Sequence, residues 1–299
     1  MSIYLFGPLI KQRREELGIS QEELADGICS VPTLSRIENG ERMPSKQHSE
    51  MLLQRLGYSD SIQISFVTEK TLEMHNLKYK IRQAVIHRRF EEAGELLKQF
   101  IAEADRGDCV SEQFILLCQV QVSQLSPEER LEQLTKAMRM TCPQYSPAAI
   151  PEFLSYEEIV ILNNIALCYG DSGQLDMAIN ILSALKRHHE NHMVNREEIM
   201  RTQLMILYNL STFLGQAQRY DECIEICNQG IRISQETRRC NNLDKLYYNK
   251  AWSLVRRKRT NDILTAKECI RLAICTAEAL NRPALKKRFV EFMQSNFTD

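Results

Sequence analysis

The 299-residue sequence has no long hydrophobic run and few residues that break helices. Its longest apolar stretches, such as residues 114–117 and 159–162, are far shorter than the ~20 residues that a membrane-spanning helix requires. With only 11 glycines and 8 prolines, a β protein with many turns is excluded, and we expect a mainly helical chain. The net charge of −1 gives no overall attraction to nucleic acid or membrane, so such a partner must be recognised locally.

Motifs for catalysis and cofactor binding are also missing. The sequence has no C-x-x-C pair, nucleophile elbow, phosphate-binding glycine loop or H-E-x-x-H, so we expect no enzyme, metal or cofactor. The one histidine cluster, His188, His189 and His192, favours a solvated helix end because it lacks partners at a known ligand spacing. Charge begins early in the N-terminal segment and no cleavage site follows, so we expect a cytoplasmic protein with reduced cysteines.

The first 57 residues predict a small helical domain. Apolar residues recur at helical spacing over residues 5–17, and Ser20 with Glu23 predicts a capping box at the start of a second helix. Ser30 predicts the N-cap of a third helix that Gly40 terminates. Two short helices around a glycine-containing turn are typical of a helix-turn-helix, whose second helix enters the major groove of DNA.

Within that second helix, residues 31–39, the apolar spacing separates an inner from an outer face. Leu34 and Ile37 lie three residues apart and predict the stripe that packs inward. The residues left near the outer face are Val31, Pro32, Thr33, Ser35 and Arg36. Of these, Arg36 can donate two hydrogen bonds to guanine, while Val31 or Pro32 can touch a thymine methyl group.

The segment GISQEELADGICSVPTLSRIENGERMPS resembles the helix-turn-helix of the xenobiotic-response-element/Cro family, and the match extends from about Leu9 to Gly57. The resemblance implies a phosphate or base contact by Gln21 and a buried pair between Arg14 and Glu38. It places Ser30, Thr33, Ser35 and Arg36 toward the groove, and Asn39, Arg42 and Lys46 on backbone phosphates. The link between Gln21 and Asn39 is one residue shorter than the most common form, and is similar to the branch in peptide-pheromone receptors of Gram-positive bacteria.

The charge of this region opposes DNA binding. Residues 1–65 hold seven basic against nine acidic side chains, whereas phosphate neutralisation normally dominates affinity for DNA. The remainder holds 31 basic and 30 acidic residues. Two interpretations stay open: a domain that binds DNA through a few placed side chains, and a degenerate domain that keeps only the fold.

The remaining residues repeat. Residues 163–185 align with residues 208–230, so that Ala178 matches Cys223 and Leu182 matches Cys227. A third copy begins at Tyr248, and a divergent first copy lies around residues 88–97. The register predicts that Cys223 and Cys227 are core residues, because buried cysteine behaves as a small hydrophobe.

These copies resemble the tetratricopeptide repeat, whose first helices line a concave surface suited to extended peptides. Asparagine recurs at one slot in Asn164, Asn209 and Asn249, and its amide can pair with a peptide backbone; alternatively, it bonds the neighbouring repeat. Neighbouring slots predicted to contact peptide are Asn163, Leu167, Asp171, Tyr208, Thr212, Gln216, Lys245, Tyr248, Trp252 and Arg256. Lys245 or Arg256 can hold a carboxylate, and Trp252 can form the floor of an apolar pocket.

The whole chain resembles the RRNPP quorum-sensing receptors of Gram-positive bacteria. The resemblance implies an all-α fold, with a lambda-repressor-like helix-turn-helix domain over residues 1–64. A right-handed superhelix of tetratricopeptide-like helix pairs follows over residues 65–299. The implied protein is a cytoplasmic transcriptional regulator that binds a short signalling peptide and, as a homodimer, operator DNA with two-fold half-sites, with no membrane partner. We expect dimerisation through an apolar C-terminal surface formed by Leu272, Ala273, Leu280, Phe289 and Phe292.

Two alternatives remain at this point. The repeats can bind a protein partner, such as an antirepressor, in place of a peptide. The chain can also be a repeat scaffold or enzyme inhibitor whose N-terminal domain is vestigial.

Overall fold

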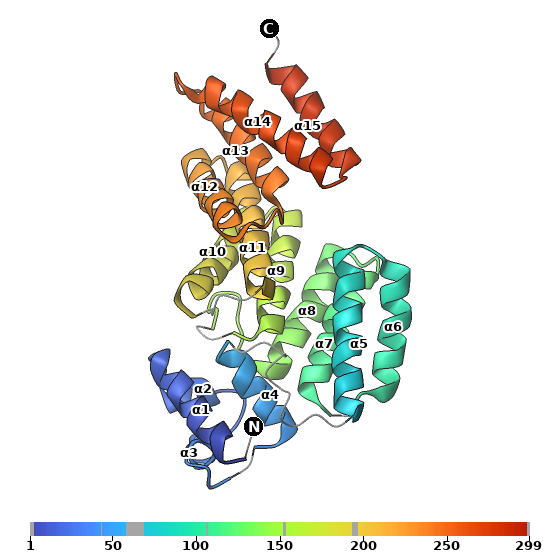
Figure 1. Cartoon of the computed structure of the whole chain (residues 1–299), viewed down its shortest axis with the longest axis vertical. Coiled ribbons are helices and arrows are strands. Elements are labelled where there is room, and N and C mark those ends of the chain that lie inside the picture. Colours follow the sequence, from blue (N-terminus) through green and yellow to red (C-terminus); the bar gives the residue numbers. More distant parts are fainter. Residues whose placement is uncertain are drawn as a thin grey trace. The chain divides into compact units, whose positions relative to one another are not determined.

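Helices form nearly all of the regular structure in the computed structural model (Figure 1). The structure describes residues 3–42, 44–57, 69–105, 107–151, 154–192 and 197–297. Within these ranges there are fifteen helices and no strand, which confirms the all-α prediction.

In chain order the helices are α1 (Ile3–Glu16), α2 (Gln21–Ala25), α3 (Val31–Glu38), α4 (Lys46–Arg55), α5 (Glu69–Ile86), α6 (Phe90–Glu103), α7 (Cys109–Val122), α8 (Pro127–Thr141), α9 (Tyr156–Asp171), α10 (Leu175–His192), α11 (Glu197–Gln216), α12 (Tyr220–Thr237), α13 (Leu243–Arg257), α14 (Asp262–Ala279) and α15 (Pro283–Asn296).

Helices α1 to α4 surround one hydrophobic core. Ile10, Leu24, Leu34 and Leu52, one from each helix, are fully buried in it. Burial of each such side chain contributes about 1.5–3 kcal/mol to the free energy of unfolding, so these residues are a main source of this small domain's stability. The predicted domain boundary between residues 64 and 65 lies outside the described residues and stays a prediction.

The chain divides into two compact units. Unit 1 comprises Met1–Cys168 and Glu190–Val194, and unit 2 comprises Tyr169–His189 and Asn195–Asp299. In unit 1 the pairs α5–α6 and α7–α8 pack successively, and in unit 2 the pairs α11–α12 and α13–α14 do the same, followed by α15. The helix pairs therefore follow the repeat pattern that the sequence predicts.

Small residues occupy the repeat positions where helices approach closely. Ala178, Cys223 and Cys227 are completely buried, which confirms that both cysteines are core residues. The Cys223 thiol donates to the Ser211 carbonyl oxygen at 3.1 Å, and the Ser253 hydroxyl donates to the Cys223 sulfur at 3.0 Å. These polar contacts tie α12 to both α11 and α13.

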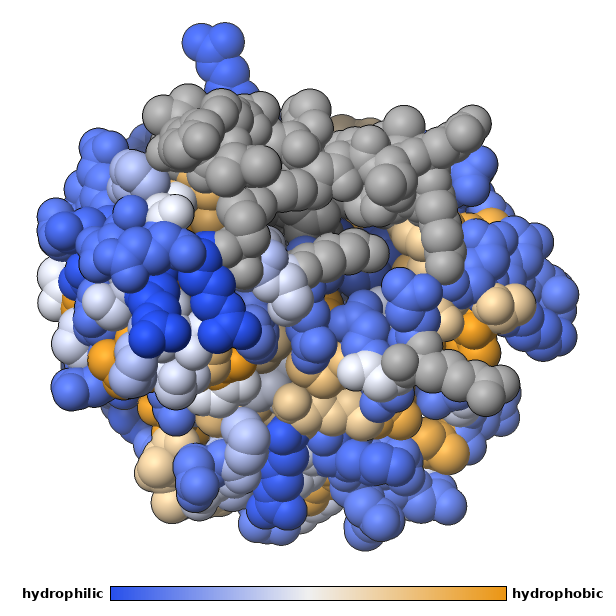
Figure 2. Space-filling model, turned by 90° about the horizontal axis from the view of Figure 1, so that it is seen from below, coloured by the Kyte–Doolittle hydropathy of each residue, from blue (hydrophilic) through white to orange (hydrophobic). Residues whose placement is uncertain are grey.

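The surface contrasts with this interior. On the face drawn in Figure 2, the described residues are mainly hydrophilic, and hydrophobic side chains appear in small patches between them. No described helix is long and apolar enough to cross a membrane.

Gly170 tests how closely these repeats must pack. A Cβ atom at this position would lie 2.1 Å from the Phe213 ring, and Phe213 is buried. We expect Gly170→Ala to lower the free energy of unfolding by about 1–3 kcal/mol, as overpacking does. The measurement is urea unfolding followed by circular dichroism.

Gly94→Ala is the matched control, because a Cβ atom there meets nothing within 4 Å inside α6. Alanine is the better helix former, so this variant should be unchanged or stabilised by up to about 1 kcal/mol. Equal effects of the two substitutions would contradict the close-packing account.

Candidate nucleic-acid interface and inner-helix surface

The two helices of the helix-turn-helix begin at side-chain caps. The Ser20 hydroxyl accepts from the Glu23 amide at 3.1 Å while Glu23 accepts from the Ser20 amide, which confirms the predicted capping box. These hydrogen bonds to Ser20 lower the pKa of the exposed Glu23 carboxyl. The Ser30 hydroxyl caps α3 through the Thr33 amide, so the start of α3 is fixed as predicted.

A buried ion pair joins α1 to α3. The Arg14 guanidinium donates to both carboxylate oxygens of Glu38, at 2.7 and 3.0 Å, and Glu38 is 2% exposed. The hydrogen bond to Glu38 raises the pKa of Arg14. The pair that the family resemblance implied is therefore confirmed.

Gln21 takes part in the same cluster. Its amide nitrogen donates to Glu38 at 2.7 Å, although the sequence resemblance implies a DNA contact for this residue. The amide nitrogen thus has a structural partner inside the domain, and a contact to DNA by the rest of the side chain stays a prediction.

The outer face of α3 carries most of the side chains that the sequence placed there. Pro32 and Arg36 are exposed, while Thr33 and Ser35 are half-buried. The hydroxyls of Ser30 and Thr33 are hydrogen-bonded to each other at 2.9 Å. Leu34 and Ile37 are buried, so the predicted inner stripe is confirmed.

Three further positions complete the predicted interface. Asn39 is the exposed C-cap of α3, and Arg42 follows it on the surface. Lys46 begins α4, and its side chain lies outside the described residues. Val31 departs from the prediction in part, because its apolar side chain packs against the core and is only partly exposed.

The helix-turn-helix contacts the repeats through α7 and α8, which the sequence did not predict. Val110 from α7 is buried within the core of α1 to α4, and Gln47 donates to the Cys109 sulfur beside it. A Cβ atom on Gly27 would lie 2.6 Å from the Thr141 carbonyl oxygen at the end of α8. Glycine also suits the positive φ of +67° at this turn, so Gly27 is the one sequence signal of the contact.

A hydrogen-bond network continues from this contact into α9. The Gln113 amide donates to Thr141 Oγ1 at 2.7 Å, and Thr141 Oγ1 donates to Glu158 at 2.6 Å. Gln113, Thr141 and Glu158 are buried, so each polar group needs these partners. Glu158 also accepts from the Ser155 amide, which caps the start of α9. The turn of the helix-turn-helix therefore connects through buried hydrogen bonds to a first helix of the repeats.

In unit 2, Tyr208 of α11 and Lys245, Trp252 and Arg256 of α13 form a polar and aromatic strip, which we call the inner seam. The Lys245 ammonium lies 4.6 Å from the Tyr208 ring centroid, and the Arg256 guanidinium lies 3.5 Å from the Trp252 ring centroid. Trp252 also contacts Tyr220 edge-on, with 6.1 Å between the ring centroids. Cations on aromatic faces are stabilised by the ring quadrupole, so both basic groups are held in place.

The asparagines do not form a free ladder. Asn249 donates to Ser211 Oγ and Thr212 Oγ1, both at 2.9 Å, so it bonds the preceding repeat. Asn164 donates to the Val160 carbonyl oxygen of its own helix at 2.8 Å. Asn163 and Asn209 are 2% and 7% exposed. For Asn249, the prediction of an amide presented to a peptide backbone is therefore corrected, because this residue fits the alternative of bonding between repeats. For Asn163, Asn164 and Asn209, contact with a peptide stays a prediction.

Tyr248 and the predicted dimer surface also need correction. Tyr248 is buried and stacks on Phe289 of α15, with ring centroids 4.7 Å apart. Ala273 and Phe289 are buried in this same core, and Phe292 packs against it. Leu280 is half-buried, and Leu272 is exposed. These residues mainly cover each other because α15 closes the repeat array, so they do not form the expected apolar surface.

The remaining predicted peptide contacts are accessible to differing degrees. Leu167, Tyr208, Thr212, Lys245 and Trp252 are half-buried, whereas Asp171, Gln216 and Arg256 are exposed.

The histidine cluster is not a solvated helix end. His188 and His189 are 6% and 5% exposed, and burial lowers the pKa of His189 to about 3, with a smaller effect of His188. Neutral His189 packs as an apolar ring, and the side chain of His192 lies outside the described residues. No group of three or more metal-ligating side chains occurs in the described part of the chain.

The first helices of unit 1 also carry cations against rings, which sequence reasoning missed. Arg82 of α5 lies 5.5 Å from the Phe114 ring and 5.1 Å from the Tyr156 ring, and forms an ion pair with buried Glu157. Lys78 lies 5.3 Å from the Phe114 ring. These residues come from three helices, and no local pattern in the sequence brings them together.

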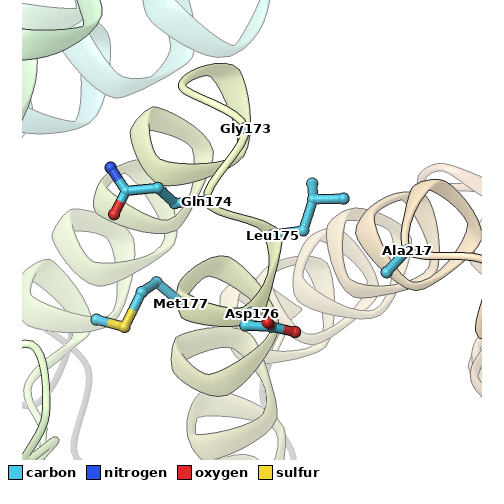
Figure 3. A pocket seen from close by; sticks show the side chains of 6 residues that line it. All are labelled: Gly173, Gln174, Leu175, Asp176, Met177 and Ala217. Carbon is cyan, nitrogen blue, oxygen red and sulfur yellow. The ribbon is translucent and has the colours of Figure 1, made fainter.

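An open pocket of about 540 Å³ lies elsewhere in unit 2, lined by Gly173, Gln174, Leu175, Asp176, Met177 and Ala217. Figure 3 shows Leu175 directed toward the helix of Ala217, with Gln174 and Met177 on the opposite side. The polar groups therefore do not converge as they do in a specific small-molecule site. The pocket contains none of the predicted peptide contacts.

The fold thus defines a class of protein: a helix-turn-helix followed by helical repeats. Comparison with known families matches residues 10–62 to a helix-turn-helix family and residues 78–282 to the RNPP family C-terminal domain. The second match covers well over half of the chain, which therefore belongs to the RNPP family. This confirms the resemblance derived from the sequence. No curated protein sequence matches the chain.

Solved structures share this fold. The crystal structure of Bacillus thuringiensis PlcR in complex with the peptide PapR7 and DNA has 19% identity and a TM-score of 0.62, covering 95% of this chain and 98% of PlcR. The apo form of the same PlcR has 18% identity and a TM-score of 0.60, covering 96% and 98%. The apo form of the competence regulator ComR from Streptococcus vestibularis has 18% identity and a TM-score of 0.56, covering 100% of both chains.

The Arg14 and Glu38 pair gives a direct stability test. In Arg14→Met, the buried Glu38 carboxylate loses its charge partner, and we expect a loss of about 3–5 kcal/mol in the free energy of unfolding. Lys98→Met is the control, because Lys98 and Glu95 are both well exposed and such a pair contributes at most about 1 kcal/mol. Urea unfolding of both variants provides the measurement. A loss in Arg14→Met no larger than in Lys98→Met would refute the structural role of the pair.

Proposed function

We propose that this protein is a transcriptional regulator whose binding to operator DNA is controlled by a short signalling peptide. One observation carries the proposal: the same chain contains a helix-turn-helix with an exposed Arg36 and an RNPP family C-terminal domain. The fold it shares with PlcR, whose structure contains both a peptide and DNA, supports the same function. The protein then acts as a regulator in the cytoplasm and not as an enzyme.

DNA recognition depends on α3. Arg36 donates to a guanine edge in the major groove, and Thr33 and Ser35 reach neighbouring bases or phosphate. Neither Arg36 nor Arg42 forms an ion pair within the described residues, so both guanidinium groups are available to DNA. Asn39, Arg42 and Lys46 bind backbone phosphates, as in the Cro-type interface.

The net charge of −2 over residues 1–65 limits non-specific binding, because few phosphates are neutralised by each domain. A homodimer places two recognition helices on half-sites related by two-fold symmetry, and adds their contacts. We propose that the protein binds its operator in this form.

Peptide recognition depends on the first helices of the repeats. The inner seam of α11 and α13 offers two rings and two cations within one strip. A peptide bound there changes DNA affinity only if it binds two arrangements of the protein unequally. Val110 packs into the helix-turn-helix core and Gly27 of the helix-turn-helix packs against Thr141 of α8, so the repeats have a physical connection to the DNA-binding domain.

Arg36→Ala tests the DNA-binding surface. An operator is first selected with the wild-type protein from random duplex DNA, and its dissociation constant is measured by fluorescence anisotropy at fixed salt. Loss of one bidentate base contact costs about 1–3 kcal/mol, so we expect binding to weaken by about 5–150-fold per half-site. Lys11→Ala, which removes an exposed charge from α1, is the control and should bind nearly as wild type. Unchanged operator binding by Arg36→Ala would mean that α3 is not the recognition helix.

Trp252, the sole tryptophan, tests the peptide surface directly. Candidate peptides are those encoded by a small reading frame with a secretion signal beside the gene. Binding of one of them should change the Trp252 emission and produce a calorimetric signal. Trp252→Leu, which removes the ring under Arg256, should weaken calorimetric binding by about tenfold or more, as loss of an aromatic anchor does.

Leu264→Ala on α14 is the control for that substitution, because Leu264 is 69% exposed and lies outside the inner seam. Equal peptide affinity of Trp252→Leu and wild type would show that the inner seam does not bind the peptide. Binding of a folded protein partner in place of every peptide would favour an antirepressor-type regulator.

A further inference from the structure

The inner seam is strongly asymmetric in charge. Residues 200–216 contain no carboxylate, and within α13 the one carboxylate is Asp244. Asp244 is fully buried and accepts from Arg282 at 2.8 Å, so its charge is already compensated. The basic side chains Lys245 and Arg256 both lie on α13. The strip that we assign to peptide binding is therefore positively charged, although the whole chain is nearly neutral.

Arg256 is held in a geometry that leaves its donors available. Its guanidinium lies 3.5 Å from the Trp252 ring centroid, and one nitrogen makes a long bond of 3.4 Å to the Trp252 carbonyl oxygen. Stacking uses the flat face of a guanidinium, whereas the N–H groups point outward in its plane. The side chain is exposed, so these N–H groups can form a two-bond contact with a carboxylate.

Lys245 forms a second cationic position at the other end of the seam. Its ammonium lies 4.6 Å from the Tyr208 ring centroid and 3.1 Å from Asn242 Oδ1, so the charge is positioned rather than freely rotating. One face of α13 carries side chains three or four residues apart, namely Lys245, Asn249, Trp252 and Arg256. The rise of a helix places Lys245 and Arg256 about 16 Å apart along the axis. An extended peptide covers that distance with about five residues.

We propose that the signalling peptide of this receptor is acidic, with one carboxylate at Arg256 and another at Lys245. One of these two carboxylates is the C-terminal carboxylate of the peptide, or an Asp or Glu side chain near the C-terminus. The other is an acidic side chain about five residues away along the peptide. This inference rests on the proposed peptide-binding function and specifies the class of peptide. Charge complementarity then selects the cognate peptide, and like charge at the seam rejects basic peptides.

The test uses the full-length protein and three fluorescein-labelled heptapeptide sublibraries. One carries fixed Asp or Glu with a free C-terminus, the second carries Asn or Gln with a C-terminal amide, and the third carries Lys or Arg. Because charged hydrogen bonds contribute more than neutral ones, we expect the acidic pool to bind about tenfold or more tighter than the neutral pool. Its affinity should fall as salt is raised. Equal or tighter binding of the neutral or basic pool would overturn the inference.

A double-mutant cycle locates the contact. For the tightest acidic peptide, Arg256→Met and replacement of the partner carboxylate by its amide should each weaken binding by about tenfold. Combining them should give little further loss, because both remove one interaction. Arg232→Met, which removes an exposed charge from α12, is the control and should bind as wild type.

The outcomes separate this inference from the function on which it rests. Independent, additive losses in the cycle would contradict the contact between Arg256 and the carboxylate. Tight binding of neutral peptides would contradict acidity but support a peptide receptor. Failure of all three pools to bind would contradict both the inference and the proposed function.

Discussion

The hydrogen-bonded ion pair between Arg14 and Glu38 determines how the recognition helix is presented. Glu38 belongs to α3 itself, and it accepts from Arg14 on α1 and from Gln21 on α2. Three helices therefore meet at one buried carboxylate, which would be costly to bury without its partners. Because the last turn of α3 is fixed inside the domain, its opposite face and the exposed Arg36 are oriented outward. The proposed DNA contact depends on this internal arrangement.

The second constraint is the contact of this domain with α7 and α8. Val110 fills part of the core that α1 to α4 enclose, and the buried Gln113, Thr141 and Glu158 network continues to the start of α9. Packed side chains and fully bonded polar groups resist small displacements, so a change in the repeat helices has a route to the helix-turn-helix. In unit 2, Asn249 plays a comparable part by bonding α13 to α11. The repeats thus combine close packing with a few directed hydrogen bonds.

Local sequence signals predicted much of the fold. Capping at Ser20 and Ser30, the inner stripe of Leu34 and Ile37, and the register of Cys223 and Cys227 each depend on neighbouring residues, and the structure confirms them. The errors concern side chains whose environment comes from distant helices. The sequence predicts accessible positions for Tyr248 and Phe289, but Phe289 on α15 stacks on Tyr248 and both side chains are buried. It also predicts a solvated His189, which the fold buries. An asparagine amide can bind either a peptide backbone or a neighbouring repeat. For Asn249 the positions of Ser211 and Thr212 in the fold determine that it binds the neighbouring repeat.

In the proposed function, one chain couples peptide binding to operator binding. The direct measurement is the operator dissociation constant of the full-length protein, determined with and without saturating cognate peptide, together with the peptide dissociation constant with and without operator. We expect the peptide to change operator affinity by about fivefold or more, and the operator to change peptide affinity by the same factor, as linkage requires. Binding of both ligands with neither affinity altered by the other would contradict this coupling.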